Sequence, residues 1–398
     1  MQISVQNTLN LINIIIESLF PDLSAHLQRT AYISLCLAQT LRLPQRDIEH
    51  LFIAASIHDI GILDKKRTCI TASDLVDEGV MAGHEHKGVM MIKGIRFLAP
   101  VLPLVGRHHI VWNETQHDDL SLGCHILHMA DTLDLFLRAQ PGDYIVNSQM
   151  IIENYLAKHS PFPPALIAAL RTLQQQDIFW FRLASKRLHR VLAEVSPLNH
   201  RMINTDDLLE VCQLIAKIID TYSNFTMTHS ISVSNVARFL AKKMALPSEI
   251  QKEIAIAGYL HDIGKLHVPL ELLEKNGRLS CSEYALVRTH SYKTLEMLSL
   301  IKPLSRIKLW AANHHERLDG SGYPRGLTSY NIDLPSKILA IADVFTAMTE
   351  NRPYRKGMEP ERALDIIRED VQNKRLERTV FDVLETHLQH SCSLVLKM

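Results

Sequence analysis

Seven histidine and aspartate residues in the second half of the chain have the types and spacing of a metal site. They are His229, His261, Asp262, His290, His314, His315 and Asp343. Imidazole and carboxylate together suit Fe, Mn or Zn better than Ca or Mg, whose ligands are oxygen atoms. Seven ligands exceed what one ion needs if positions stay open for water and substrate, so they predict two ions bridged by one carboxylate. Two ions about 3.5–4 Å apart are the usual clamp for displacement at a phosphoester.

The same residue types recur in the same order in the first half of the chain. The matching residues are His26, His58, Asp59, His84, His108, His109 and Asp131. The offset between the copies grows only from 203 residues at the His-Asp pair to 212 residues at the last Asp. We therefore interpret the chain as two copies of one domain.

The elements that must position these residues are predicted to be helices. The segment 255–265 places apolar residues at i, i+3, i+4 and i+7, and 361–371 is another amphipathic stretch. Alternating strand patterns are essentially absent, so the predicted fold class is all-α. The predicted parts are a first domain over 1–180, a linker helix over 181–202 and a second domain over 203–398.

Composition excludes several classes of protein. Lys+Arg and Asp+Glu both total 43, so the net charge is zero, which argues against a general nucleic-acid binder. The six cysteines contain no C-x-x-C pair, which excludes a zinc ribbon. The first residues lack a basic signal-peptide region, and no stretch approaches the ~20 apolar residues of a membrane span. We expect a cytoplasmic protein with no membrane and no nucleic-acid partner.

Three segments of the second half resemble the HD-GYP family of cyclic-dinucleotide phosphodiesterases nearly letter for letter. They read HDIGK at 261–265, HHERLDGSGYP at 314–324 and ADVFTAMTENRPYR at 342–355. The resemblance covers roughly residues 203–398, and the simpler HD pattern extends over the first half. It implies a tandem of HD-superfamily helical domains.

The resemblance implies a role for each ligand. One ion would be held by His229, His261, Asp262 and Asp343. Asp262 would bridge to a second ion, held also by His290, His314 and His315. The implied cofactors are two divalent ions, Fe or Mn first and Zn or Ni as alternatives. Family members with a third metal carry a Glu four residues before the first His, and Phe225 stands there, so we expect two ions.

The implied catalytic residues are Asp262 and Lys265. Lys265 lies at i+3 from Asp262 and would face the same site, where a cation can stabilise charge on a phosphoryl group. The other implied phosphate contacts are Arg352 and Arg355. The loop residues Gly322, Tyr323 and Pro324 would shape the cleft and present the tyrosine ring to a base.

The implied activity is metal-dependent hydrolysis of cyclic di-GMP to linear pGpG and further to GMP in bacterial second-messenger signalling. The first alternative is a phosphodiesterase for 3′,3′-cyclic GMP-AMP. The second is a signalling module that binds the nucleotide or a partner without turnover. Another HD phosphohydrolase, acting on (p)ppGpp or dNTPs, is disfavoured by the GYP loop. Diguanylate-cyclase-type proteins are candidate partners through that loop, and a homodimer is left open.

The first copy keeps all seven candidate ligands and loses the phosphate-binding cations. Lys265 corresponds to Ile62, Arg352 to Gln140 and Arg355 to Asp143, and the GYP loop is missing. We therefore expect this half to sense or scaffold and to hydrolyse no cyclic dinucleotide. Two interpretations of its seven residues stay open, a second metal site and a hydrogen-bonded polar cluster.

Overall fold

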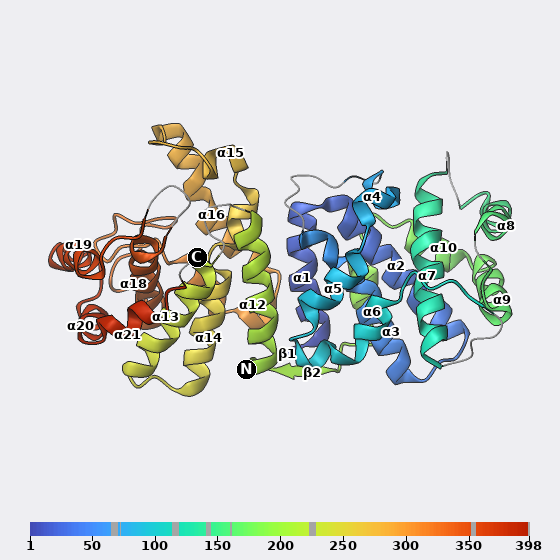
Figure 1. The fold of residues 1–398 in the computed structure, drawn as a ribbon, viewed down its shortest axis with the longest axis horizontal. Helices are drawn as coiled ribbons and strands as arrows, with labels where there is room; N and C mark the ends of the chain where they lie inside the picture. The colour runs from blue at the N-terminus through green and yellow to red at the C-terminus, as the bar shows by residue number, and fades with distance from the viewer. Residues whose placement is uncertain are drawn as a thin grey trace. The chain divides into compact units, whose positions relative to one another are not determined.

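The computed structural model describes residues 1–64, 71, 73–113, 119–140, 145–159, 161–222, 228–351 and 356–396. Almost all regular structure in these ranges is helical (Figure 1), which confirms the all-α prediction. The strands among them are β1 (Gln2–Ser4) and β2 (Met202–Asn204), which pair with each other.

The first half is a series of helices, several of them short. Their bounds are α1 Val5–Leu19, α2 Pro21–Thr40, α3 Gln45–Ile57, η1 Ile60–Asp64, η2 Asp74–Val76, α4 Glu78–Met81, α5 His84–Ile92, η3 Arg96–Val101, α6 Leu102–Gly106, α7 Asp119–Arg138, α8 Ser148–Lys158, α9 Pro164–Gln174, α10 Asp177–Leu183 and α11 Leu188–Val195, where η marks a 3-10 helix.

The second half repeats this order. Its bounds are α12 Thr205–Tyr222, α13 His229–Lys243, α14 Ser248–Leu260, η4 Ile263–His267, α15 Leu270–Leu273, α16 Cys281–Ser299, η5 Lys302–Leu304, α17 Ile307–Ala312, α18 Leu334–Thr349, α19 Pro360–Gln372, α20 Arg378–Thr386 and α21 Leu388–Ser393. The elements that carry candidate ligands match in pairs, namely α2 with α13, α3 with α14, η1 with η4, α5 with α16, α6 with α17 and α7 with α18.

The chain divides into two compact units. The N-terminal unit comprises 4–9 and 16–202, and the C-terminal unit comprises 1–3, 10–15 and 203–398. The predicted linker, 181–202, contains α11 and groups with the N-terminal unit. Part of α1 groups with the C-terminal unit, so a simple cut at residue 203 would not isolate either unit intact.

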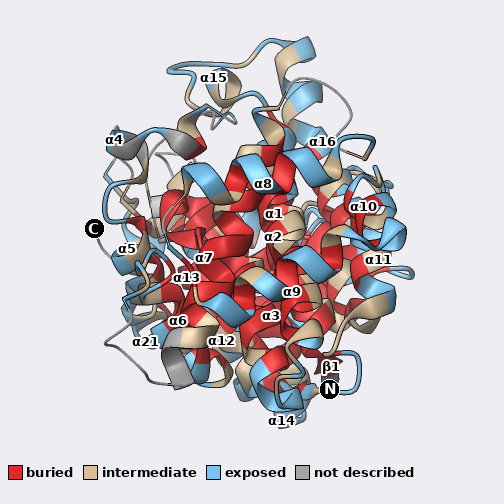
Figure 2. Cartoon of the chain, turned by 90° about the vertical axis from the view of Figure 1, so that its right-hand side faces the viewer, coloured by how far each residue is buried: buried red, intermediate tan, exposed pale blue. Residues whose placement is uncertain are grey.

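A buried apolar core surrounds the candidate ligands in each unit. Figure 2 shows the buried residues gathered along helices of the N-terminal unit, α2 and α7 among them. In the C-terminal unit the apolar side of α18 is buried, with Ile338, Leu339 and Phe345 at zero exposure. Polar residues inside such a core need partners, because an unpaired buried polar group costs free energy.

One aspartate ties the two helices that carry the last ligands of the C-terminal unit. Asp333 is the N-cap of α18, and its carboxylate accepts the backbone N–H of Ser336 at 3.2 Å. The other oxygen of Asp333 accepts the indole N–H of Trp310, in α17, at 2.5 Å. This capping contact therefore holds the end of α17, where His314 follows, against the start of α18.

No helix in the described part of the chain is long and apolar enough to cross a membrane.

Candidate metal centres

The structure brings all seven candidate ligands of the C-terminal unit together. Subsets of them place one ligand atom each within 4.8 Å of one another, and all but His315 are buried. They come from five places in the fold: the start of α13, the α14–η4 junction, the middle of α16, the turn after α17, and the middle of α18.

A glycine allows α16 to pack closely against the segment that carries His261 and Asp262. Gly264, in η4, packs against the backbone of α16, and an added Cβ would overlap the carbonyl oxygen of His290. Gly61 has the same relation to the carbonyl oxygen of His84 in the N-terminal unit. Both glycines are therefore required by contact between two backbones, and they bring the His-Asp pair next to the third histidine.

The two carboxylate oxygens of Asp262 face different histidines. Asp262 Oδ2 lies 3.2 Å from His261 Nε2, whereas Oδ1 lies 3.6 Å from His290 Nε2 and 4.0 Å from His314 Nε2. A carboxylate with one oxygen toward each of two ligand groups has the geometry of a bridge between two ions.

Asp343 closes the other side of the cluster. Its Oδ1 lies 3.2 Å from His229 Nε2 and 3.8 Å from His261 Nε2, and its Oδ2 lies 3.8 Å from His315 Nδ1. His261 Nε2 is buried and makes no hydrogen bond within the described residues. A buried, unpaired nitrogen surrounded by carboxylate oxygens fits a metal ion, and this observation shows that the donor set suits one.

Three imidazoles are oriented by their own backbone turn. His261, His290 and His314 each donate Nδ1–H to the carbonyl oxygen three residues earlier, at 2.8, 2.6 and 2.6 Å. These bonds fix the tautomer and leave each Nε2 with a lone pair toward the centre of the cluster. Metal-ligating histidines characteristically make such a second hydrogen bond.

The first histidine is oriented by a carboxylate that sequence reasoning missed. His229 Nδ1 lies 3.1 Å from Glu350 Oε2, and Glu350 is the C-cap of α18, buried to 3% exposure. In the N-terminal unit, His26 Nδ1 lies 2.8 Å from Asp134 Oδ2, on α7. Asp134 follows the last Asp by three positions and Glu350 follows it by seven, so each lies on the same helical side as that Asp. The two offsets differ, so the repeat does not align these residues and the sequence does not single them out.

Burial and neighbouring charges both shift the pKa values of the cluster residues. Burial raises the pKa of Asp262, but His261 and Lys265 outweigh it and hold that pKa well below its usual value. Burial and the neighbouring imidazoles lower the pKa of His314, and burial lowers that of His315 to about 3. Ionised carboxylates and neutral imidazoles are the protonation states that bind metal.

His229 and His261 are exceptions. Burial lowers the pKa of His229, but Glu350 and Asp343 raise it to about 10. Asp262 and Asp343 likewise raise the pKa of His261 against the effect of burial. A metal ion at this position therefore displaces a proton from His229 when it binds.

The predicted phosphate-binding cations are described only in part. Lys265 Nζ lies 2.5 Å from Asp262 Oδ2, and its side chain is 22% exposed, so it stands between the cluster and solvent. Arg352 and Arg355 lie outside the described residues, as does Phe225, on which the expectation of two ions depends.

The GYP loop lies against the cluster. The centre of the Tyr323 ring lies 4.8 Å from the centre of the His315 ring. The guanidinium of Arg288, on α16, lies 4.7 Å from the centre of the Tyr323 ring. An added Cβ at Gly322 would overlap the backbone of Arg317, so this position requires glycine. Pro324 follows in the same loop.

A buried glutamate within the motif anchors this loop. Glu316, 3% exposed, accepts the backbone N–H groups of Arg325 and Leu327 at 2.7 and 2.8 Å. The sequence did not predict that Glu316 would hold the loop backbone or that Arg288 would contact the Tyr323 ring. Neither residue belongs to a sequence pattern that indicates its contacts.

The N-terminal unit assembles its seven residues in the same way. Asp59 Oδ2 lies 3.4 Å from His58 Nε2, and Oδ1 lies 2.9 Å from His84 Nε2 and 3.6 Å from His108 Nε2. Asp131 Oδ1 lies 3.1 Å from His26 Nε2. The carboxylate of Asp59 thus has the same two-sided arrangement as that of Asp262.

The remaining distances also agree between the units. Asp131 lies 3.8 Å from both His58 Nε2 and His109 Nδ1, the values found for the matching pairs in the C-terminal unit. His58, His84 and His108 again pair Nδ1 with the carbonyl oxygen three residues earlier, at 3.1, 2.5 and 2.7 Å.

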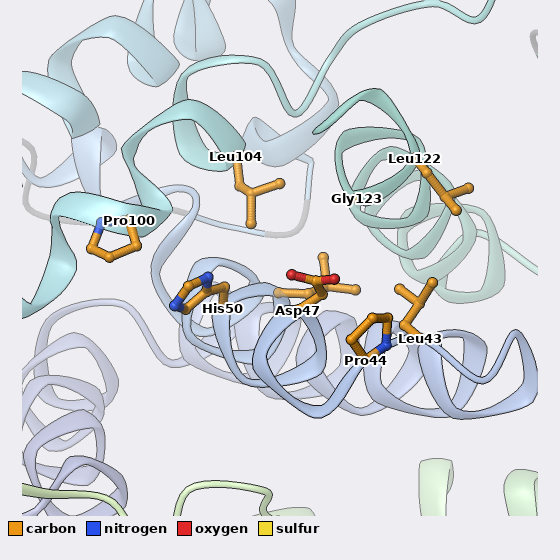
Figure 3. A pocket seen from close by; sticks show the side chains of 9 residues that line it. Leu43, Pro44, Asp47, His50, Pro100, Leu104, Leu122 and Gly123 are labelled. Atoms are coloured by element: carbon orange, nitrogen blue, oxygen red, sulfur yellow. The ribbon is translucent and has the colours of Figure 1, made fainter. Parts of the chain in front are cut away.

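A separate, largely apolar cavity of about 420 Å³ lies in the N-terminal unit (Figure 3). Its polar lining residues are Asp47 and His50, on α3, and Leu104 and Leu122 line it from α6 and α7. None of its lining residues is a candidate ligand.

Comparison with protein families finds two HD domains. One HD-domain model matches residues 23–135 and another matches residues 213–380.

Individual relatives are phosphodiesterases. The chain is 31% identical over 386 residues to 3′3′-cGAMP-specific phosphodiesterase 1 of Vibrio cholerae serotype O1, covering 94% of this chain and 89% of that protein. It is 39% identical over 140 residues to a cyclic di-GMP phosphodiesterase of Pseudomonas aeruginosa, covering 35% and 34% of the two chains. The crystal structure of a V. cholerae cyclic GMP-AMP-specific phosphodiesterase, V-cGAP3, matches 98% of both chains with a TM-score of 0.63 at 20% identity, which shows a shared fold.

Proposed function

The chain belongs to the HD-GYP family of cyclic-dinucleotide phosphodiesterases, and on that basis we propose that its C-terminal unit hydrolyses 3′,3′-cyclic GMP-AMP with two bound divalent ions. The observation that carries the metal-dependent activity is the two-sided placement of Asp262 among histidines. The observation that favours this substrate over cyclic di-GMP is the relative that matches across both halves of the chain and is specific for 3′3′-cGAMP.

The grouping of the side chains supports the assignment of ligands to the two ions. His229, His261 and Asp343 would hold one ion, and His290, His314 and His315 would hold the other. Asp262 would contribute to both, since its Oδ2 faces His261 and its Oδ1 faces His290. When bound, the two ions would supply Lewis acidity toward the phosphate and lower the pKa of a water molecule. Fe or Mn suits this mixture of imidazole and carboxylate.

Lys265 contributes a positive charge where phosphate charge grows during the reaction. Its ammonium group is held by Asp262 at 2.5 Å, so it is positioned before substrate arrives. Its partial exposure leaves N–H donors for a phosphoryl oxygen. A donor placed in advance stabilises the transition state without a cost of reorganisation.

The GYP loop closes one side of the cleft. Glu316 holds the loop backbone, and the Tyr323 ring packs between His315 and Arg288. Tyr323 therefore keeps His315 in place and contributes a rigid aromatic wall beside the phosphodiester.

The test is a comparison of two substrates on the full chain. Protein loaded with Mn²⁺ or Fe²⁺ is assayed with 3′,3′-cyclic GMP-AMP and with cyclic di-GMP, and kcat/KM is expected to be higher for the former. A higher kcat/KM for cyclic di-GMP would overturn the proposed substrate preference but would still support phosphodiesterase activity. Binding of both nucleotides without hydrolysis of either would overturn the activity and support a signalling module.

Elemental analysis of the same samples tests the number of ions. Asp262→Ala should lower the metal content by two ions per chain relative to the intact protein, because the bridge contacts both ligand groups. A loss of one ion or of three would contradict the two-ion assignment.

A further inference from the structure

The apolar cavity of the N-terminal unit lies between elements that have counterparts in the C-terminal unit. Residues at the start of α3, in η3, in α6 and near the start of α7 line it. The matching elements of the other unit are α14, η5, α17 and α18, so the residue at each lining position can be compared between the units. The volume of about 420 Å³ is within the range of about 300–1,000 Å³ that is typical of small-molecule sites.

In the C-terminal unit an indole ring and a guanidinium group take the corresponding positions. By the repeat, Trp310 stands at the position of Leu104, and Arg306 stands at the position of Pro100. Trp310 is 3% exposed, and the guanidinium of Arg306 lies 5.8 Å from the centre of its ring. Arg306 also pairs with the buried carboxylate of Glu253 at 2.9 Å. The C-terminal unit therefore fills this place with an aromatic ring and a cation that is bound to a carboxylate.

Smaller residues leave the same place open in the N-terminal unit. Leu104 is smaller than its indole counterpart, and Pro100 carries no cation. Gly123 has no side chain on α7, where the C-terminal unit has a proline. Leu43 and Leu122 complete an aliphatic wall around the opening (Figure 3). The cavity therefore has room for a ring and a cation that the N-terminal unit does not itself supply.

The polar part of the lining is a carboxylate and an imidazole. Asp47 and His50 project from α3 toward Leu104 (Figure 3), and neither side chain makes a hydrogen bond within the part of the chain that the structure describes. Burial and the positive charges of Arg201 and Arg46 lower the pKa of His50, so its imidazole is neutral near pH 7. The lining therefore offers a negative charge, on Asp47, at the edge of an apolar space.

We propose that this cavity binds a small aromatic cation, with its ring among the leucines and its ammonium group on the carboxylate of Asp47. Burial of the ring in apolar surroundings is favourable, and an ammonium group makes a charge-assisted hydrogen bond to a carboxylate. The ligand would take the place that Trp310 and Arg306 take in the other unit. The proposal goes beyond the phosphodiesterase activity, because none of the lining residues is a candidate metal ligand or phosphate contact.

Calorimetric titration of the full chain with two probes that share a ring tests the class of ligand. Tryptamine carries an ammonium group on an indole ring, and indole-3-acetate carries a carboxylate on the same ring. Tryptamine should bind, and indole-3-acetate should bind more weakly, because Asp47 repels its carboxylate. An absence of tryptamine binding, or tighter binding of indole-3-acetate, would overturn the proposal. These titrations use no dinucleotide, so their outcome is independent of the proposed activity.

Asp47→Asn tests the carboxylate at nearly constant volume. The substitution should raise the Kd of tryptamine by about two- to five-fold, as expected for an ion pair with an exposed carboxylate. Asp177→Asn is the matched control, because Asp177 is also an exposed aspartate in the first turn of a helix of this unit, α10. An equal effect of the two substitutions would overturn the assignment of the charge to Asp47.

Leu104→Trp tests the location, because it places the residue of the C-terminal unit in the cavity. Filling the cavity should abolish tryptamine binding, and thermal unfolding checks that the variant remains folded. Gly123→Ala is a milder second variant, since its Cβ would lie 3.0 Å from Leu104 Cδ2, and it should raise the Kd of tryptamine. Tryptamine binding that is unchanged in folded chains of both variants would overturn the location.

Discussion

The two units hold the same set of candidate ligands, with different charged residues around them. The matching carboxylate–imidazole distances to Asp131 and Asp343 differ by 0.1 Å or less. The residues around the ligands differ more, since Lys265 and Arg288 in one unit correspond to Ile62 and Ala82 in the other. The comparison teaches that the arrangement of the candidate ligands is kept where the neighbouring cations are not.

The largest expected effect comes from removing Asp262, the proposed bridging carboxylate of the C-terminal unit. Asp262→Ala should abolish hydrolysis by the full chain, because the other ligand set lacks any lysine or arginine at the matched phosphate positions. Initial rates with 3′,3′-cyclic GMP-AMP measure this. Residual turnover comparable to that of the intact protein would show that the N-terminal unit is a catalyst, and would break the comparison.

Removing Lys265, the proposed catalytic cation, should have a smaller effect. Lys265→Ala is expected to lower kcat by about 10²–10³ and to leave the metal content unchanged, since the lysine acts on phosphate charge. Lys293→Ala is the matched control, because Lys293 is a partly exposed lysine on α16 that pairs with Glu296 at 2.7 Å. Loss of metal in Lys265→Ala would reassign this lysine to a structural role.

Substitution of the carboxylate that contacts Nδ1 of His229 or of His26 should change metal binding only in the unit that contains it. Glu350→Gln and Asp134→Asn are expected to weaken metal binding by about 10–100-fold in their own unit only. Competition with a chromophoric chelator measures both affinities. Asp134 also contacts Arg29 and Arg138, so Asp134→Asn should lower the thermal stability more than Glu350→Gln does. A loss of affinity in both units from one substitution would show that the sites are coupled.

The smallest effect is expected at Arg288. Its contact with the Tyr323 ring is exposed, and such cation–π contacts contribute about 0.5–1 kcal/mol. Arg288→Ala should therefore raise KM by about two- to five-fold and leave kcat near its original value. A fall in kcat with KM unchanged would indicate that Arg288 acts in the transition state.

The helical fold and the candidate ligands could be predicted because each leaves a local pattern. Apolar residues at helical spacing predict the helices, and the recurrence of His-Asp and His-His pairs predicts the two clusters. The spacing of Lys265 from Asp262 placed both residues on one face, and the structure has them in contact. The metal, catalytic and substrate-binding roles of these residues stay predictions.

The residues that support the ligands could not be predicted in the same way. Glu350 and Asp134 take equivalent positions behind the first histidine from different offsets along their helices, so the repeat does not align them. Glu316 contacts backbone groups nine and eleven residues later, in a loop without regular periodicity. Such contacts depend on the path of the chain in space, which a residue pattern does not contain.

The hydrogen bond from each Nδ1 to the carbonyl three residues earlier has a consequence for how such a domain can change. His58, His84 and His108 are oriented by the turn on which each is located, and so are their counterparts in the other unit. Their orientation is independent of any substrate-binding loop. A duplicated domain can therefore lose its catalytic loop and cations in gradual steps while its ligands stay aligned, which leaves a preformed coordination site available for a new role.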